Sequence, residues 1–500
     1  MNKIIFLSLS LIVAIGGTSV KGENTVYRGA FRVNSSVTSG TESVEEIAGN
    51  AEKVGLDFVV MSDQMLVKAE YGIPPFRNIL KLSIRRPDAV SYGLDKYFGL
   101  IKSADAKRDI VMIYGLDVAP GYFWTGSIFK KNLINRQFSE QLTVFGNEDP
   151  DFYRNLPVIH NDLPEKNVIK IILKSWPLVI SIFGMLVFSS AFIAYYSDRQ
   201  GKKYYRRGRF KISVGIIFII TGVLWTLDNR PMTRDLGIDI YSFQGNLPYQ
   251  NLIDYVNENG GKHTGVIWSA PEARTTNLIR RIPLHTEPYL SSVLSSMNHN
   301  GLAGIYGDAI TAHLPGKEWD KMLLEHCQGT RKKLPVIVGE LDYHGKTDRP
   351  IDLIQTSVFC EKTNSKPERR NKIIESILAG KSYAVFKGAK SEIVLIEVKL
   401  SSGDKKAELG ETLEVGGDKI TLDIRGTLSS PEEESLDFAL VMNGNLLCGK
   451  QIKASAGKFE ISETFEADPG LKNKQYVRFY IRSGSSGWLL ANPIFIKKNR

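Results

Sequence analysis

The residue types that most often carry out chemistry are sparse in this sequence and follow no familiar catalytic spacing. The three cysteines, Cys327, Cys360 and Cys448, form no CxxC pair that would indicate zinc binding or redox chemistry. In an oxidising compartment Cys327 and Cys360 could pair, and buried free thiols are the equal alternative. There is no nucleophile elbow, phosphate-binding glycine-rich loop or dinucleotide fingerprint. Six of the seven histidines lack metal-ligand spacing among themselves: His160, His263, His285, His299, His313 and His326.

Strand-like and helix-like segments alternate in both halves of the chain, and any functional site must be positioned by them. Residues 26–33 and 56–61 are strand-like, and residues 41–53 between them have helical apolar spacing with Thr41 or Ser43 as N-cap. The same order returns after about residue 249. Such β-α-β order predicts an α/β fold built on a parallel sheet or barrel.

The last hundred residues follow a different pattern. Five strand-like runs follow one another with Gly, Ser and Asp clusters between them and no helical pattern: 393–398, 420–425, 436–441, 459–464 and 476–481. This spacing predicts a small β-sandwich.

Two uncharged runs in the middle of the chain predict a transmembrane helical hairpin. Residues 176–196 are long enough to span a bilayer, with Trp176 and Tyr195 where the interfaces would lie. A second run, 212–227, is shorter and is extended by Phe210 and the stem of Lys211. Buried soluble helices are the alternative interpretation.

Charge around this hairpin predicts its orientation. The loop at 197–211 holds seven basic residues and one acid, Asp198, and short basic loops stay in the cytoplasm. A basic start, an apolar run and small residues at 1–22 predict a signal peptide, with an uncleaved anchor as the alternative. Both signals place the bulk of the chain on the external or periplasmic side of the cytoplasmic (inner) membrane, as a multi-pass protein. Because so much of the net charge of +10 lies in this loop, nucleic acid is not an expected partner.

Several segments resemble the opening of the PHP (polymerase and histidinol phosphatase) family. They are Gly29-Ala30-Phe31-Arg32-Val33-Asn34, Gly55-Leu56-Asp57-Phe58 through Ser62-Asp63-Gln64, and later Tyr114-Gly115-Leu116-Asp117, Val266 through Pro271, and Gly339-Glu340-Leu341-Asp342-Tyr343-His344. The resemblance implies a (β/α)7 barrel whose strand ends hold two or three metal ions that hydrolyse phosphoesters. The C-terminal Trp488-Leu489-Leu490-Ala491-Asn492-Pro493 resembles the tail of exported PHP-type proteins.

The departures from the family motif concern its metal ligands. The two histidines of the family's H-x-H motif fall on Arg32 and Asn34, and a third falls on Gln64, while Gln141 and Ala270 take two further histidine positions. Arginine is permanently cationic and does not ligate metal, so Arg32 is expected to enter the metal position and pair with Asp63 or Asp342. Four ligand positions remain for at most one divalent ion (zinc, manganese or iron), or for none: Asp63, Asp117, Asp342 and His344.

Three functions follow from these observations. The first is a membrane-tethered, non-catalytic binding or scaffold module, in which Arg32, Asn34 and Gln64 hold an anionic or sugar-phosphate ligand. The second is a metal-dependent phosphoesterase with a reduced site, and the third is an envelope assembly protein with a protein partner. The expected organisation is a signal peptide at 1–22, a barrel in two parts at 23–165 and 229–388, a transmembrane hairpin at 169–227 with its cytoplasmic loop at 197–211, and a β-sandwich at 390–500.

Overall fold

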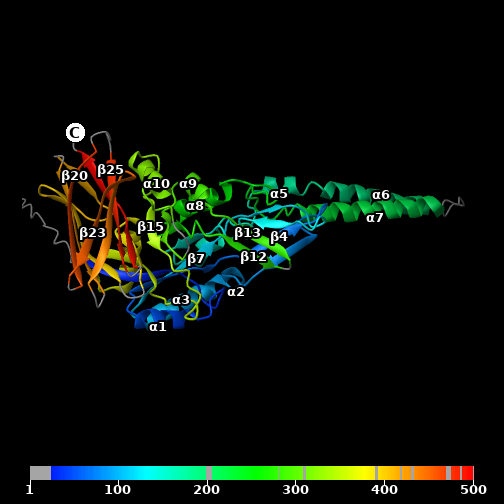
Figure 1. The fold of residues 1–500 in the computed structure, drawn as a ribbon. Coiled ribbons are helices and arrows are strands. Elements are labelled where there is room, and N and C mark those ends of the chain that lie inside the picture. The colour runs from blue at the N-terminus through cyan, green and yellow to red at the C-terminus, as the bar shows by residue number, and fades with distance from the viewer. Residues whose placement is uncertain are drawn as a thin grey trace, which may run out of the picture.

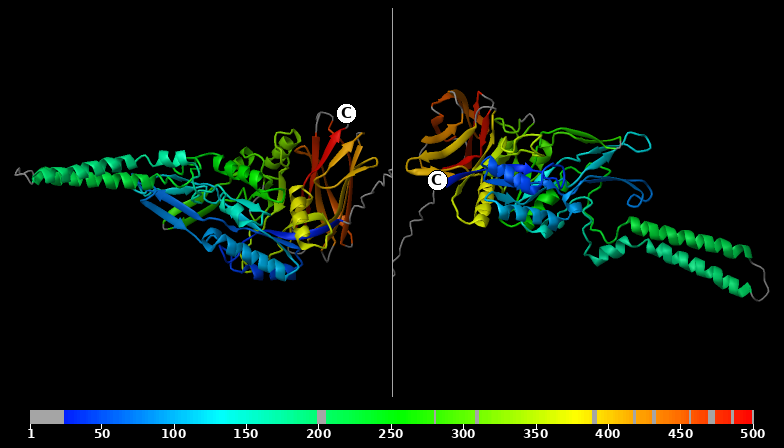
Figure 2. Two further views of the ribbon diagram at one scale, coloured as in Figure 1. Left: turned by 180° about the vertical axis from the view of Figure 1, so that it is seen from behind. Right: turned by 90° about the horizontal axis from the view of Figure 1, so that it is seen from below.

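The computed structural model describes residues 24–198, 205–279, 281–307, 311–388, 392–416, 419–429, 433–455, 457–468, 474–484 and 487–498 (Figure 1). The expected signal peptide at 1–22 and the centre of the basic loop lie outside these residues. The α/β body and the strand-rich C-terminal part lie side by side (Figures 1 and 2). A pair of long helices projects from the end of the body that is farther from the C-terminal part (Figures 1 and 2).

The first sheet begins with the N-terminal strands. β1 (Asn24–Val33) pairs in parallel with β2 (Phe58–Met61), which pairs in parallel with β6 (Val111–Ile113). On its other side β1 pairs antiparallel with β16 (Ile354–Glu361). Every residue of β2 is buried, because sheets of this kind have both faces covered.

A second, six-stranded sheet continues this body. Its order is β15 (Val336–Gly339), β14 (Gly301–Ile305), β11 (Gly265–Trp268), β10 (Leu142–Phe145), β7 (Gly115–Val118) and β3 (Asp63–Gln64). β3 follows β2 after one residue and β7 follows β6 after one residue, so the two sheets share this edge. At the far edge, the amide of Leu341 after β15 donates to the carbonyl of Phe31 on β1 at 2.9 Å. The body is therefore mixed α/β, and the closed (β/α)7 barrel stays a prediction.

Helices cover the outside of these sheets. α1 (Val44–Lys53) begins at Ser43, whose hydroxyl and Glu46 form a reciprocal capping box, which confirms Ser43 as the N-cap. The remaining helices of the body are α2 (Ala89–Tyr92), α3 (Leu94–Lys107), α4 (Pro150–Arg154), α8 (Leu247–Asn259), α9 (Leu290–Ser295), α10 (Glu318–Cys327) and α11 (Lys366–Leu378). The apolar faces of α1–α4 and α8–α10 pack with the strands into one large core, and α11 packs on the other face of β1 and β2 in a second core.

Two smaller sheets lie between this body and the long helices (Figure 1). The ribbon of β4 (Lys68–Gly72) and β5 (Lys81–Arg85) follows β3. The other sheet has the order β12 (Thr275–Ile279), β13 (Ile282–Thr286), β9 (Ile134–Arg136) and β8 (Phe123–Thr125). They share a small core that includes Tyr71 and Trp124.

The long helices α6 (Leu178–Asp198) and α7 (Tyr205–Asp228) pack against each other, preceded by the short helix α5 (Val168–Lys174). The rings of Phe183 and Phe218 meet at 5.5 Å, and the Ser181 hydroxyl donates to the carbonyl of Ile219 at 3.1 Å. Among the described residues, one helical stretch, Arg209–Asp228, is long and apolar enough to cross a membrane. α5 and Leu178–Ala191 pass the same test only together, with a bend of 51°. The transmembrane hairpin therefore stays a prediction.

The C-terminal part contains two sheets, as expected. One has the order β19 (Lys405–Ala407), β18 (Ile393–Ser402), β21 (Lys419–Leu428) and β24 (Lys458–Glu466). The other strands are β20 (Thr412–Val415), β22 (Glu434–Met442), β23 (Asn445–Ala454), β25 (Lys474–Ser483), β26 (Trp488–Ala491) and β27 (Ile494–Lys498). β26 pairs with β17 (Ser382–Phe386), so this second sheet is continuous with the first sheet of the body.

Candidate functional site

Arg32 lies at the centre of a cluster of acidic side chains at the end of β1. Its φ is 65°, a left-handed conformation that is uncommon for a non-glycine residue and coincides with a register shift between β1 and β2. Its Nε lies 2.6 Å from Asp117 Oδ2, and its Nη1 lies 2.5 Å from Glu340 Oε1 and 3.4 Å from Asp342 Oδ1. Its Nη2 donates to Gln141 Oε1 at 2.6 Å. One guanidinium thus contacts three carboxylates and an amide.

The strand order explains why these residues meet. Asp117 is on β7, Gln141 directly precedes β10 and Glu340 directly follows β15, and these strands belong to one sheet. The second oxygens of the buried acids are also bonded. Thr143 donates to Asp117 Oδ1 at 2.6 Å, and the amide of Ala270 donates to Glu340 Oε2 at 3.2 Å.

The cluster has more acids than its single arginine can neutralise. Burial raises the pKa of Glu340 to about 7, with Arg32 opposing and the neighbouring carboxylates of Asp342 and Asp117 adding to the rise. Burial also raises the pKa of Asp117 above its ordinary value, again opposed by Arg32. At Asp342 burial is outweighed by Arg32 and His344, so its pKa is lowered. With a pKa near 7, Glu340 is partly protonated near neutral pH.

Asp342 and His344 form the more accessible side of the cluster. Asp342 has a φ of 51° and a side chain that is 39% exposed, and its Oδ1 lies 3.3 Å from His344 Nε2. His344 Nδ1 lies 3.1 Å from the hydroxyl of Ser39. The hydrogen bond to Asp342 raises the pKa of His344 despite its partial burial.

Asp63 does not join this cluster, which corrects one expectation from the sequence. Its carboxylate accepts hydrogen bonds from the Ser35 amide at 2.9 Å, the Ser35 hydroxyl at 2.7 Å and the Thr38 hydroxyl at 2.5 Å. The side chain is fully buried, and burial raises its pKa against these hydrogen bonds. Asp63 therefore fixes the loop after β1, and of the two partners expected for Arg32 only Asp342 is found.

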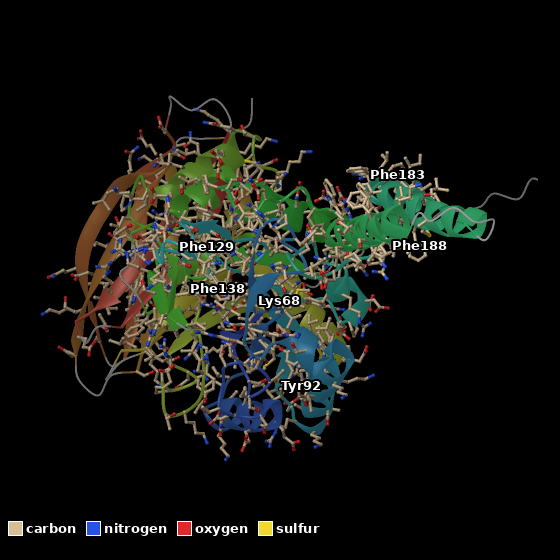
Figure 3. The ribbon with its side chains drawn as sticks, turned by 90° about the vertical axis from the view of Figure 1, so that its right-hand side faces the viewer. Lys68, Tyr92, Phe129, Phe138, Phe183 and Phe188 are labelled. Carbon is tan, nitrogen blue, oxygen red and sulfur yellow. The ribbon has the colours of Figure 1, made fainter. Side chains whose placement is uncertain are left out.

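A cavity of about 400 Å³ opens beside the cluster. Six of the seven predicted site residues line it: Arg32, Asn34, Gln64, Asp117, Asp342 and His344. Its wall also has hydroxyl and amide groups from β12 and β13, namely Thr275, Asn277 and Thr286. Segments next to β8, β9, α9 and β14 add Tyr122, Phe138, Ser139, Tyr289 and Tyr306. Lys68 and Phe138 of this wall are labelled in Figure 3. Asn34 is 2% exposed and its Oδ1 has no hydrogen-bond partner among the described residues, so it is available to a ligand.

The residues present do not fit a divalent ion. The Arg32 guanidinium lies among the three carboxylates that would surround such an ion. In the described part of the chain, no group of three or more His, Cys, Asp or Glu side chains is arranged to hold a metal. The predicted set of Asp63, Asp117, Asp342 and His344 is divided, because Asp63 serves the loop and Asp117 pairs with Arg32.

The sequence analysis missed Glu340 as a member of the site. It is an acid that directly follows the buried strand β15, so its position at a strand end was a usable signal. The family motif directed attention to Asp342, two residues later. Gln141 was identified only as the position of a replaced histidine, and its role as an acceptor for Arg32 was not foreseen.

The cysteines add no chemistry to this site. Cys327 and Cys360 are buried free thiols in this structure and do not form a disulfide with each other. Burial raises the pKa of Cys327 to about 11 and raises that of Cys360, so neither is an activated thiolate.

Comparisons with known proteins identify similar structures and no similar sequence. No family model and no curated protein matches the chain. A two-domain protein from Bacteroides vulgatus, described as containing a predicted PHP-like metal-dependent phosphoesterase, shares 11% identity over 91% of this chain and 90% of its own, with a TM-score of 0.36. The second is a protein from Bifidobacterium adolescentis that is described, by prediction, as a metal-dependent phosphoesterase. It shares 13% identity over 64% of this chain and 88% of its own, with a TM-score of 0.26.

A third similar structure is an amidohydrolase from Chromobacterium violaceum with bound sulfate and no metal. It shares 11% identity over 63% of this chain and 87% of its own, with a TM-score of 0.26. Among these neighbours, those from B. vulgatus and B. adolescentis are described as metal-dependent phosphoesterases. At such scores the comparisons carry no argument about this chain, and its site is interpreted from its own residues.

Proposed function

We propose that the chain is a membrane-tethered, PHP-like ligand-binding module in which Arg32 takes the place of a catalytic metal ion. The observation that carries the proposal is the Arg32 guanidinium, bonded to Asp117, Glu340 and Gln141 and 3.4 Å from Asp342. An arginine in this position neutralises part of the acidic cluster, and it cannot activate water as a Lewis acid does. The module binds and does not hydrolyse.

The cavity supports a polar ligand with hydroxyl or phosphate groups. Asn34, Gln64 and Asn277 supply amides, while Arg86 and Arg349 supply positive charge on the wall. Arg349 is held by Asp348 at 2.9 Å and by the carbonyl of Leu341 at 3.0 Å. This combination suits an anionic or sugar-phosphate ligand. Side-chain amides form hydrogen bonds with hydroxyl groups, and a guanidinium group can donate two parallel hydrogen bonds to one phosphate.

The tether in this proposal is the pair of helices α6 and α7. With the basic loop between them in the cytoplasm, the cavity and the β-sandwich lie on the external side of the inner membrane. The support is the apolar stretch Arg209–Asp228 and the length of α6, together with the sequence signals described above.

A ligand-binding experiment on the full chain in detergent tests this function. The unfolding midpoint is measured with glucose, glucose 6-phosphate, glycerol 1-phosphate and inorganic phosphate. At least one phosphate-bearing probe is expected to raise the midpoint, and Asn34→Ala with Gln64→Ala to abolish the rise. Gln451→Ala, exposed on β23, is the matched control.

Hydrolysis separates this module from an enzyme with a reduced site. The wild-type chain with added zinc, manganese or iron is expected not to hydrolyse p-nitrophenyl phosphate above the buffer rate. Turnover that is lost in Asp342→Asn would contradict the proposal and favour the phosphoesterase.

A further inference from the structure

The junction between the helix pair and the body contains apolar and basic side chains that the ligand cavity does not use. α6 has 21 residues, about 31 Å of helix, which by length alone matches the apolar thickness of a bilayer. α5 is bent from α6 by 51°, and α5 and Leu178–Ala191 are long and apolar enough for a span only together. In the proposed tether α5 forms the end of the span, where lipid headgroups would be.

α5 has the side-chain distribution of an interfacial helix. Four of its five apolar residues, Val168, Ile169, Ile172 and Leu173, are 64–68% exposed, and at about 100° per residue they fall within an arc of about 140°. The fifth, Ile171, lies outside this arc. Lys170 and Lys174 fall on the other side of the helix. Helices of this kind insert an apolar face into the headgroup boundary of a membrane.

Other side chains at the body end of the helix pair are typical of a membrane interface. Trp176 and Trp225 meet at 5.2 Å at the body end of the helix pair, and tryptophan is enriched at membrane interfaces. The turn between β4 and β5 is held to the end of α7, where the Asn78 amide donates to Asp228 Oδ1 at 2.7 Å. The same turn contains Leu80, which is 49% exposed.

A cavity of about 360 Å³ is lined by residues of this junction, including Asn78 and Lys174. Its wall includes Arg77, Lys174, Arg230 and Arg234. Arg230 pairs with Asp162. The other three form no ion pair with a carboxylate in the described part of the chain.

The contacts of these three cations are with an aromatic ring, a carbonyl group and solvent. Arg77 stacks over the ring of Tyr241 at 4.0 Å, and Lys174 Nζ donates to the carbonyl of Thr233 at 2.8 Å. The side chain of Arg234 is exposed.

Four acids, Glu70, Asp162, Asp235 and Asp239, lie on the same wall, and in the described part of the chain none of them forms an ion pair with these three cations. Glu70 is paired with Lys68 at 2.9 Å and Lys81 at 2.7 Å. Asp235 accepts a hydrogen bond from the backbone amide of Gly237 at 2.9 Å, and Asp239 accepts one from the backbone amide of Tyr241 at 3.0 Å. His160, also on this wall, is buried and its pKa is lowered to about 4, so it is neutral.

We infer that this junction is a binding site for anionic phospholipid, in which Arg77, Lys174 and Arg234 contact the phosphate and the apolar face of α5 contacts the acyl chains. The inference rests on the tether in the proposed function. It adds a lipid class to it, because basic residues next to an apolar face favour anionic over zwitterionic headgroups.

The test is lipid selectivity of the full chain. The protein is reconstituted in nanodiscs of equal phosphatidylcholine and phosphatidylglycerol and released into detergent, and the retained lipid is quantified by mass spectrometry. The wild type is expected to retain phosphatidylglycerol preferentially. Lys174→Gln with Arg234→Gln is expected to lower the ratio at least about fivefold, the effect of one basic side chain at a membrane surface.

Controls keep the outcomes distinct. Lys96→Gln with Lys102→Gln on α3 removes the same charge far from the junction and should leave the ratio unchanged. Soluble glycerol 1-phosphate should not displace the retained lipid, and displacement would overturn the inference in favour of a free-phosphate site. A chain embedded in the nanodisc without preference for phosphatidylglycerol overturns this inference alone. A chain that is recovered without detergent overturns the tether and the inference together.

Discussion

Two buried arginines in this molecule have opposite surroundings. Arg478 on β25 is 1% exposed and bonds both oxygens of Asp320, at 2.6 and 2.7 Å, where the β-sandwich meets α10. Arg32 is 7% exposed, faces three carboxylates and lines a cavity of about 400 Å³. One cation with one anion in an enclosed place describes a structural ion pair.

The difference shows what marks a functional site. A buried arginine by itself does not, since Arg478 is the more deeply buried of the two. Three carboxylates around one cation, the raised pKa of Glu340 and access to a cavity distinguish the Arg32 cluster from the Arg478 pair.

The largest expected effect tests the structural pair. Asp320→Ala leaves Arg478 buried without its anion and is expected to lower the free energy of unfolding by about 3–5 kcal/mol, because an unpaired buried charge is strongly destabilising. Urea unfolding of the full chain in detergent, followed by tryptophan fluorescence, measures it. Asp437→Ala, exposed on β22, should change the free energy by less than about 0.5 kcal/mol. Ligand binding in the cavity should survive in both variants.

Arg32→Met is expected to cost less, about 1–3 kcal/mol. Asp342 is partly exposed and Glu340 can take up a proton, so the acids left behind are not all charged. The same urea experiment at pH 5 and pH 8 should show a smaller loss at pH 5. A loss exceeding that of Asp320→Ala at both pH values would break the comparison.

A smaller effect appears in the pH dependence. The pKa of Glu340 is raised in the folded chain to about 7 from an ordinary value of 4.5, so the folded state binds the proton more tightly. This contribution to stability is complete below about pH 4.5 and is lost as pH rises to about 7. Glu340→Gln should therefore flatten the decline by about 2 kcal/mol between pH 5 and pH 7. If the free energy of unfolding of the variant and the wild type fell in parallel between pH 5 and pH 7, the raised pKa of Glu340 would be refuted.

The smallest effect belongs to an arginine at the surface. Arg154 pairs with Asp95 and Asp151, and all three side chains are more than 40% exposed. Arg154→Ala is expected to change the free energy of unfolding by less than about 1 kcal/mol, since solvent screens such pairs. A loss comparable to that of Arg32→Met would mean that the Arg32 cluster is not special.

Local patterns predicted the elements well and the contacts between them less well. The capping signal at Ser43 placed the start of α1, and the acidic strand ends placed Asp117 and Asp342 at one site. The partner of Asp63 could not be predicted, because it depends on how the loop holding Ser35 and Thr38 folds back on that carboxylate. The continuity of the first sheet into the sandwich through β17 and β26 likewise depends on pairing across about 100 residues.

The metal content of the full chain tests the central claim most directly. Wild-type protein and Arg32→Ala are each incubated with zinc and manganese, desalted and analysed by inductively coupled plasma mass spectrometry. Much less than one ion per wild-type chain is expected, and a gain in Arg32→Ala, since its three carboxylates would then lack a cation. Stoichiometric metal in the wild type that disappears in Asp342→Asn would contradict the account.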